Sequence, residues 1–308
     1  MPIYVKEGGT WREISSDAGS QLYVRDGTSF TNKTINNAYI KDGGSWRTVF
    51  TLFDTPGTFN TAGSGTTTFS VPGNANAIHV KQAVGGGGGG YTGASYDKAG
   101  GESSGPGGGS GAHVSDRVYT VSGGETLTSV VGSGGNAGGG AYNGTSGAGT
   151  TTSLTGSSTG SIFSLAGGGA SSVSGGGVQG PLRSNTAGTG GTATQGSSLS
   201  SGTTVDGVNI TSFTSGPRGA FNSFGDGATG GNNDNCGGDN CQINGSDGAD
   251  SYNGLAGTGG DGGRVNVAAT AGTQGGGGAG GGAENYNSGT SGSSGGAGEL
   301  VYRFVRIA

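Results

Sequence analysis

The chain has 308 residues, of which 79 are Gly and 6 are Pro, and its formal net charge is −5. Gly and Pro together are 85 of the 308 residues, a share in the range of about 25–30% that is typical of low-complexity or disordered chains. Phe, Ile, Leu and Val number only 47, below the share of about 20% that a conventional core requires. This composition argues against a doubly wound α/β enzyme, a helical bundle and a conventional two-layer core, and collagen is excluded because Gly does not recur at every third residue.

Residues 1–50 contain three copies of one short motif. The copies begin at Tyr4, Tyr23 and Tyr39 and read YVKEGGTWR, YVRDGTSFT and YIKDGGSWR. An acidic residue followed by Gly, with alternating apolar flanks, is typical of a β-hairpin. We expect three hairpins that share an apolar face, each with an aromatic pair across its strands. The module is too small for chemistry, and we interpret it as an attachment module whose docking residues are Tyr4, Trp11, Tyr23, Phe30, Tyr39 and Trp46.

A connector over residues 51–65 leads into a glycine-rich domain over residues 66–308. Alternating patterns predict strands over 66–72, 77–84, 116–122, 125–131, 151–154, 161–165 and 299–307. Gly123 and Gly124 predict a hairpin between the third and fourth of these strands. We interpret residues 180–265 as a long loop insertion and residues 299–308 as the closing strand. No Gly-free window has helical periodicity, so no α-helix is expected.

Runs of glycine follow several of these strands, at 85–90, 105–111, 167–169 with 175–177, and 275–282. An isolated run would lose too much chain entropy to be ordered. Packed side by side as helices of the polyproline-II type, the runs can exchange N–H···O=C bonds in several directions. The sequence therefore predicts an all-β fold without α-helix, in which a small β-hairpin module precedes a β-sandwich-like domain with packed polyglycine-II helices.

No constellation of catalytic residues or metal ligands is evident in the sequence. The only histidines, His79 and His113, have no zinc-site spacing to the cysteines. We therefore predict a protein that is not an enzyme and has no cofactor, with glycan hydrolysis by paired carboxylates as an alternative. Cys236 and Cys241 form either a disulfide or two free thiols. Six aspartates in a Gly/Asn matrix suit either turns, which we favour, or calcium: Asp226, Asp234, Asp239, Asp247, Asp250 and Asp261.

Aromatic residues in the glycine-rich loops have two interpretations. Amphipathic rings on loops are typical of recognition surfaces, because they cover area at low entropy cost. Alternatively, the rings plug the ends of the packed glycine helices. On the first interpretation the receptor-binding residues are Tyr91, Tyr96, Tyr142, Phe221, Phe224, Tyr252 and Tyr286.

The distribution of charge and hydropathy bears on partners and location. The net charge is negative and no Lys/Arg cluster exists, which argues against nucleic acid as a partner. No apolar run reaches the roughly 18–20 residues of a membrane span, so membrane insertion is not expected. The N-terminus lacks the pattern of a signal peptide, and we expect synthesis in a cytoplasm without processing.

The order of motifs over residues 66–308 resembles that of glycine-rich domains in bacteriophage tail-fibre proteins and adhesins. The resemblance lies in FSVP at Phe69, the IHV strand at Ile78 before oligoglycine, the segment from Val118 to Gly135, and the terminal GELVYRF. The hairpin motifs also look like short repeats of phage virion proteins. The resemblance implies a virion protein at a fibre tip, with glycine helices as a scaffold and variable loops that bind a bacterial surface protein or glycan.

The resemblance further implies that the N-terminal module docks on other virion proteins, and that the chain is either a homotrimer or bound to a trimeric fibre. An alternative is a structural virion component, such as a capsid decoration or head-fibre protein without receptor contact. A third class, an ice-binding protein with glycine helices, needs flat Thr arrays, and the Thr residues of this sequence are scattered along the chain.

Overall fold

The computed structural model describes residues 59–73, 75–92, 104–139, 144–174, 184–196, 245–251, 258–263, 267–281 and 290–305, together with the backbones of short strands elsewhere in the chain. Every regular element among them is a β-strand, and all strand pairs are antiparallel. The predicted all-β fold class is confirmed. The absence of helix in the described part follows from the Gly content and from the lack of 3.6-residue apolar periodicity.

The N-terminal repeats form three separate two-stranded sheets, β1–β2, β3–β4 and β5–β6. Their strands span Ile3–Glu7, Thr10–Ile14, Gln21–Asp26, Ser29–Thr34, Asn37–Asp42 and Ser45–Thr51. The register places Tyr4 opposite Glu13 and Trp11 opposite Lys6, and the other two hairpins repeat this arrangement. The two aromatic residues of each hairpin therefore lie on opposite strands in diagonal positions, which aromatic side chains can bridge, and their pairing stays a prediction.

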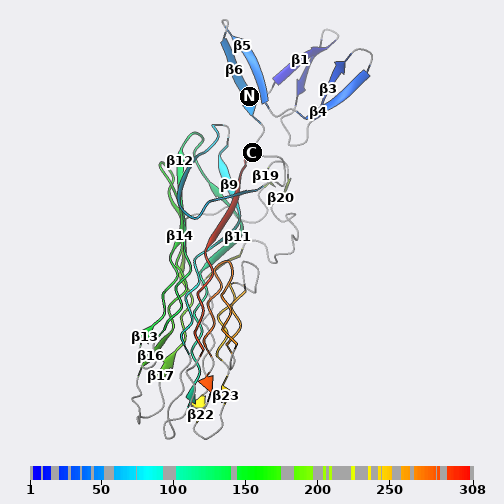
Figure 1. Cartoon of the computed structure of the whole chain (residues 1–308). Coiled ribbons are helices and arrows are strands. Elements are labelled where there is room, and N and C mark those ends of the chain that lie inside the picture. The colour runs from blue at the N-terminus through cyan, green and yellow to red at the C-terminus, as the bar shows by residue number, and fades with distance from the viewer. Residues whose placement is uncertain are drawn as a thin grey trace.

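Two five-stranded sheets form a β-sandwich (Figure 1). The first sheet has the order β21–β11–β9–β25–β7, with strands at Ser223–Gly225, His113–Thr120, Ala77–Val84, Glu299–Val305 and Asn60–Thr61. The second sheet has the order β18–β15–β14–β12–β8, with strands at Ala193–Gln195, Gly160–Leu165, Thr152–Gly156, Thr126–Val131 and Gly65–Ser70. The predicted strands agree with these bounds to within a few residues.

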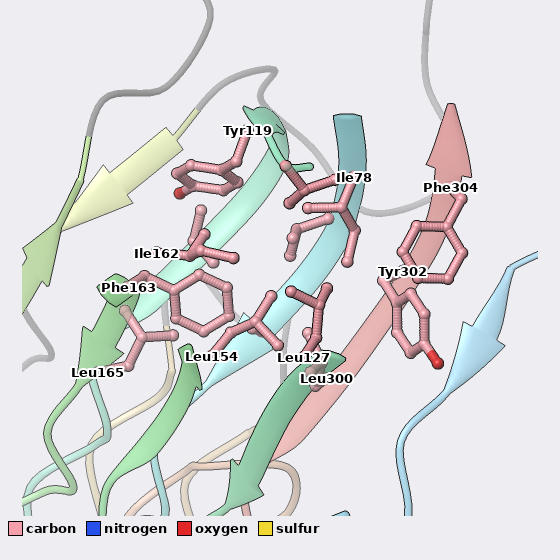
Figure 2. Packing of buried hydrophobic residues seen from close by; sticks show 14 of the residues in the cluster. Ile78, Tyr119, Leu127, Leu154, Ile162, Phe163, Leu165, Leu300, Tyr302 and Phe304 are labelled. Carbon is pink, nitrogen blue, oxygen red and sulfur yellow. The ribbon is translucent and has the colours of Figure 1, made fainter. Parts of the chain in front are cut away.

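A small apolar core lies between the two sheets (Figure 2). Ile78, Tyr119 and Leu300 of the first sheet face Leu154 and Phe163 of the second, and all five side chains are fully or almost fully buried. Most of the large apolar residues that the structure describes are gathered in this core, so the expectation from composition against a conventional two-layer core is wrong. Tyr302 and Phe304 of β25 extend this core toward β8, where Phe69 stacks on Tyr302 with ring centroids 4.6 Å apart.

The predicted hairpin between β11 and β12 does not form. β11 pairs with β9 and β21, whereas β12 pairs with β8 and β14, so the turn at Gly123 and Gly124 crosses from one sheet to the other. Gly124 has a φ of 82° and donates its N–H to Val71 O instead of closing a ladder. The Gly-Gly turn was identified correctly, but a local turn signal does not specify the sheet to which the next strand belongs.

Most sandwich strands continue directly into extended glycine-rich segments, which pack into one bundle (Figure 1). We call this bundle the glycine lattice. It comprises residues 85–92, 104–112, 132–139, 144–151, 166–171, 187–192, 245–251, 258–263, 270–281 and 291–298. β9 continues into 85–92, for example, and 104–112 leads back into β11. The sandwich therefore fixes one end of most lattice segments.

Backbone hydrogen bonds in the glycine lattice repeat every third residue. The segment 85–91 donates every third N–H to residues 106–112, through the pairs Gly85–Ala112, Gly88–Gly109 and Tyr91–Pro106. Its other N–H groups donate to residues 147–150 and 293–296, and its carbonyls accept from 135–138, Gly168 and 278–281. One segment is thus bonded to six neighbours, three antiparallel and three parallel. A three-residue repeat with bonds in several directions is what polyglycine-II helices require.

Glycine is required in this lattice because backbones touch on every side. A Cβ on Gly87 would collide with the carbonyl of Gly276, and one on Gly88 with the carbonyl of Gly169. Both contact distances would be well below 3.0 Å, a separation under which Cβ atoms are essentially never found. Segments 187–192, 245–251 and 258–263 belong to the same lattice. The interpretation of residues 180–265 as a loop insertion is therefore wrong for these parts.

The remaining strands are short pairs and one three-stranded sheet, β13–β16–β17. Their bounds are Glu102–Ser103 (β10), Gly144–Thr145 (β13), Ser172–Ser174 (β16), Ser184–Thr186 (β17), Thr204–Val205 (β19), Val208–Asn209 (β20), Asn235–Cys236 (β22), Gln242–Ile243 (β23) and Ala283–Glu284 (β24). β13, β16, β17, β22 and β23 lie at the end of the lattice remote from the sandwich (Figure 1). We call this the distal end.

Candidate functional site

The distal end is where several lattice segments stop and reverse direction. Tyr91 bridges to Gly138, and Gly281 donates its N–H to Tyr91 O. Gly105 in turn donates to Gly281 O. Segments that end or begin at residues 92, 104, 139, 144, 281 and 290 therefore meet at this end. The lattice holds these segment ends at fixed positions.

Tyr91 lies inside the distal end and is not available to a receptor. Its side chain is 0% exposed, and its hydroxyl donates to Gly139 O at 3.2 Å. The ring occupies the space beside Gly138 and Gly144, where added Cβ atoms would touch it. The assignment of Tyr91 as a receptor-binding residue is wrong. The alternative interpretation, in which a ring plugs the end of the lattice, holds for this residue.

Hydroxyl side chains satisfy carbonyls of the lattice next to Tyr91. Thr92 Oγ1 donates to Gly138 O at 2.7 Å, and Ser146 Oγ donates to Gly89 O at 2.5 Å. Ser171 Oγ also donates to Gly89 O, at 3.1 Å. These bonds matter because a buried backbone carbonyl without a partner would cost about 1–3 kcal/mol. These hydrogen bonds among lattice residues therefore hold the distal end together independently of the surface loops.

Three predicted recognition residues belong to connections that start and finish at the distal end. Tyr96 lies between Thr92 and Ser104, Tyr142 between Gly139 and Gly144, and Tyr286 between Gly281 and Thr290. Tyr96, Tyr142 and Tyr286 themselves lie outside the described residues. What the lattice establishes is that the chain on either side of each of them reaches the same end of one scaffold.

The described chain at or beside the other predicted recognition residues lies away from the distal end. Tyr252 follows Ser251, whose hydroxyl donates to Gln274 O near the sandwich end of the lattice. Phe224 lies on β21, opposite Val114 of β11 in the first sheet. Phe221 and Tyr252 lie outside the described residues. The seven aromatic residues therefore do not form one site.

Cys236 also belongs to the distal strands. It lies on β22 opposite Glu102 of β10, and β23, which begins one residue after Cys241, pairs with β24. Cys241 lies outside the described residues, so the choice between a disulfide and two thiols stays a prediction. The docking side chains assigned to the N-terminal hairpins likewise lie outside the described side chains, and their role stays a prediction.

The described aspartates of the 226–261 region form hydrogen bonds within the lattice, through their carboxylates or their backbone N–H. Asp247 Oδ1 accepts from Gly262 N at 2.7 Å, and Asp250 Oδ1 accepts from Gly259 N at 2.7 Å. The backbone N–H of Asp261 donates to Thr270 Oγ1. Asp226, Asp234 and Asp239 lie outside the described residues. The described part of the chain contains no group of three His, Cys, Asp or Glu residues that could hold a metal ion.

A buried polar cluster lies on the outer face of the first sheet. Lys81 Nζ contacts both carboxylate oxygens of Asp116, at 2.7 and 2.8 Å. His79 Nε2 lies 3.3 Å from Asp116 Oδ1, and Arg303 Nε donates to His79 Nδ1 at 3.2 Å. Phe59 covers Arg303, with 5.3 Å between the guanidinium carbon and the ring centre. Asp116 has a φ of 51°, a conformation in which Asp is enriched.

Sequence reasoning did not find this cluster. The available signal was the alternation of His79 and Lys81 with buried Ile78 and Val80 along β9, which places them on the opposite face. Their partner Arg303 is more than two hundred residues away, so a pattern within one strand could not supply it. Because His79 is fully buried and bonded on both ring nitrogens, we interpret the cluster as structural.

His79 is held in its neutral form. Since Arg303 Nε can only donate, Nδ1 accepts and the ring proton resides on Nε2, which donates to Asp116. Burial lowers the pKa of His79 below 6.5, the nearby charges of Arg303 and Lys81 lower it further, and Asp116 opposes the change. His79 therefore binds a proton less readily in the folded protein than in the unfolded chain.

We expect stability to fall as the pH drops below about 6.5, because only the unfolded state then binds a proton at His79. The loss begins at the unfolded pKa and levels off below the lowered folded pKa. The slope attributable to this residue is at most about 1.4 kcal/mol per pH unit. Urea unfolding between pH 5 and 8 measures it. His79→Gln should flatten the profile in this range, and an unchanged profile would contradict the assignment.

Comparisons with known proteins add no family. No protein-family model matches this chain, and a comparison with curated proteins finds no significant match. Within the described residues, no helix has the length and hydropathy needed to cross a membrane.

Proposed function

We propose that the protein is a bacteriophage virion protein of the fibre or adhesin type that attaches the particle to the bacterial surface. One observation carries this proposal: a glycine lattice bonded on all sides brings the flanks of the connections that contain Tyr96, Tyr142 and Tyr286 to one end. A rigid scaffold that presents several loops at one end suits recognition, because the loops can vary without disturbing the scaffold. The ligand class is a surface protein or glycan of the host.

The N-terminal module supports the attachment half of this proposal. Three hairpins with the same register next to the turn form three separate sheets, and isolated two-stranded hairpins are marginally stable in water. A partner that covers them would stabilise them. We propose that they dock on other virion proteins, with Tyr4, Trp11, Tyr23, Phe30, Tyr39 and Trp46 as the contact residues, in a homotrimer or on a trimeric fibre.

The proposed role is binding without catalysis and without a cofactor. The most concentrated group of titratable side chains in the described part is the His79 cluster, where His79 and Asp116 have side-chain exposures of 0% and 4%. A substrate could not reach the His79 and Asp116 side chains without displacing the residues that bury them. Their hydrogen bonds explain a packing role, and no attacking group or open position beside them supports a reaction.

Binding of the labelled, full-length protein to a panel of bacterial strains tests the proposal. We expect saturable binding to a subset of strains, and loss of at least about tenfold in affinity when Tyr96, Tyr142 and Tyr286 are replaced by Ser together, since aromatic anchors dominate such interfaces. Tyr252→Ser, in a loop whose flank Ser251 lies toward the sandwich, is the matched control. Equal loss in both variants would contradict a distal site.

Labelling of the protein on intact phage particles separates the proposal from its main alternative. Label at fibre tips, with purified protein blocking adsorption, supports the adhesin. Label over the capsid, without any effect on adsorption, would favour a decoration or head-fibre protein and overturn the proposal.

A further inference from the structure

The four sheet edges of the sandwich differ in length. β7, β18 and β21 have two, three and three residues, whereas β8 has six. Native sheets commonly limit edge-to-edge association by keeping edge strands very short. Three edges of this sandwich follow that rule and β8 does not.

β8 also lacks the other devices that protect an edge. Its sequence, GTTTFS, contains no charge and no Pro, and it pairs with β12 over six consecutive residues without a bulge. Bulges do occur elsewhere, between β14 and β15 and between β9 and β25. Among the described residues, none hydrogen-bonds to the free edge of β8, and five of its six residues are exposed.

The outer face of the second sheet beside β8 is uncharged and rich in hydroxyl groups. Thr126, Thr128 and Val130 of β12 point outward, since Leu127, Ser129 and Val131 between them are buried. Their register partners on β8 are Ser70, Thr68 and Thr66. On the other side, Thr128 faces Thr155 of β14. Another strand can therefore be added at β8 without burying or opposing any charge.

We infer that β8 is a strand-addition site whose occupant is a second copy of this chain. An added strand must keep outward residues opposite outward residues, or the core face would turn to solvent. An antiparallel copy with Thr68 opposite Thr68 meets this condition, and it pairs Thr66 with Ser70 and Thr67 with Phe69. The arrangement has twofold symmetry, so both chains use the same surface. This inference does not depend on the proposed function.

The second copy is favoured over an unrelated strand by the chemistry of the edge. When two copies of one edge strand pair, charged residues on that strand would bring like charges together. β8 carries no charge, so its self-pairing avoids this repulsion. Thr–Thr pairs on one face also stabilise antiparallel ladders. Because a six-residue edge provides only part of the roughly 1,200 Å² that stable interfaces bury, the association is weak and depends on concentration.

Sedimentation equilibrium of the full-length protein over a wide range of concentrations tests this inference. We expect the mass to rise with concentration from 29.3 kDa toward twice that value. Thr68→Lys places two like charges together on the twofold axis and should weaken the dimer by at least about tenfold. A mixture of Thr68→Lys and Thr68→Glu should restore association that neither variant shows alone.

Thr155→Lys is the matched control, because Thr155 and Thr68 are both exposed and flank the same residue, Thr128, but Thr155 is inside the sheet. It should dimerise as the wild type does. Thermal unfolding of each variant at low concentration checks that the monomer is folded. A chain that is monomeric at all concentrations, a dimer that survives Thr68→Lys, or equal loss with Thr155→Lys would each overturn the inference.

Discussion

Gly88→Ala is expected to abolish folding of the glycine lattice. The added methyl carbon would collide with the backbone of Gly169, and the segment that carries it is bonded to six neighbours that hold one another in place. Overpacking of an ordinary core costs about 1–3 kcal/mol because side chains rotate away. Backbone atoms have no such freedom, so we expect a loss above about 4–5 kcal/mol, close to the total stability of many domains. Yield of soluble protein and thermal unfolding measure this loss, and Gly87→Val or Gly88→Val should be at least as severe.

Gly139→Ala is the matched control for this substitution. Gly139 lies in the same lattice, yet an added Cβ would have no atom within 4 Å. Its unfolding temperature should be close to that of the wild type. If Gly88→Ala folds as well as Gly139→Ala, the close backbone packing of the lattice is wrong.

Tyr91→Ala is expected to destabilise the protein by about 3–5 kcal/mol, the usual cost of removing a buried aromatic ring. The ring is fully buried at the distal end, and the glycines around it cannot fill the space that it leaves. Urea unfolding measures the free energy, and hydrogen exchange of the lattice amides shows whether the distal end opens first.

Tyr91→Phe keeps the ring and removes only the hydroxyl bond to Gly139 O, so it should cost about 0.5–1.5 kcal/mol. The pair of variants therefore separates packing from hydrogen bonding. A Tyr91→Ala protein with wild-type stability and impaired cell binding would return Tyr91 to the recognition residues.

The strands and their glycine runs were predictable from the sequence because both signals are local. β9 alternates and then meets six glycines, and β25 has the strongest alternation near the end of the chain. The pairing of strands was not predictable. β12 follows β11 through a Gly-Gly turn, yet the two strands belong to different sheets, and Tyr119 and Leu127 both enter the core between those sheets.

The candidate site was predictable only in part, for a similar reason. Tyr91 and Tyr96 look alike in sequence, since both are aromatic residues just after the hexaglycine run. Only the packing of distant glycines, Gly138 and Gly144, shows that Tyr91 is enclosed. The His79 cluster was missed because its bonds join β9, β11 and β25. Asp247 and Asp250 were expected in turns, but each accepts a hydrogen bond from a different lattice segment, from Gly262 N and Gly259 N respectively.

The three-residue repeat of the lattice also has a consequence for folding. A glycine run shifted by three residues would regain nearly all of its hydrogen bonds, since one glycine is the same as the next. The run itself therefore carries almost no information about alignment. That information comes from its two boundaries, the strand β9 on one side and the ring of Tyr91 on the other. The sandwich fixes where each segment starts, and we expect the lattice to adopt a single alignment only when the sandwich is folded.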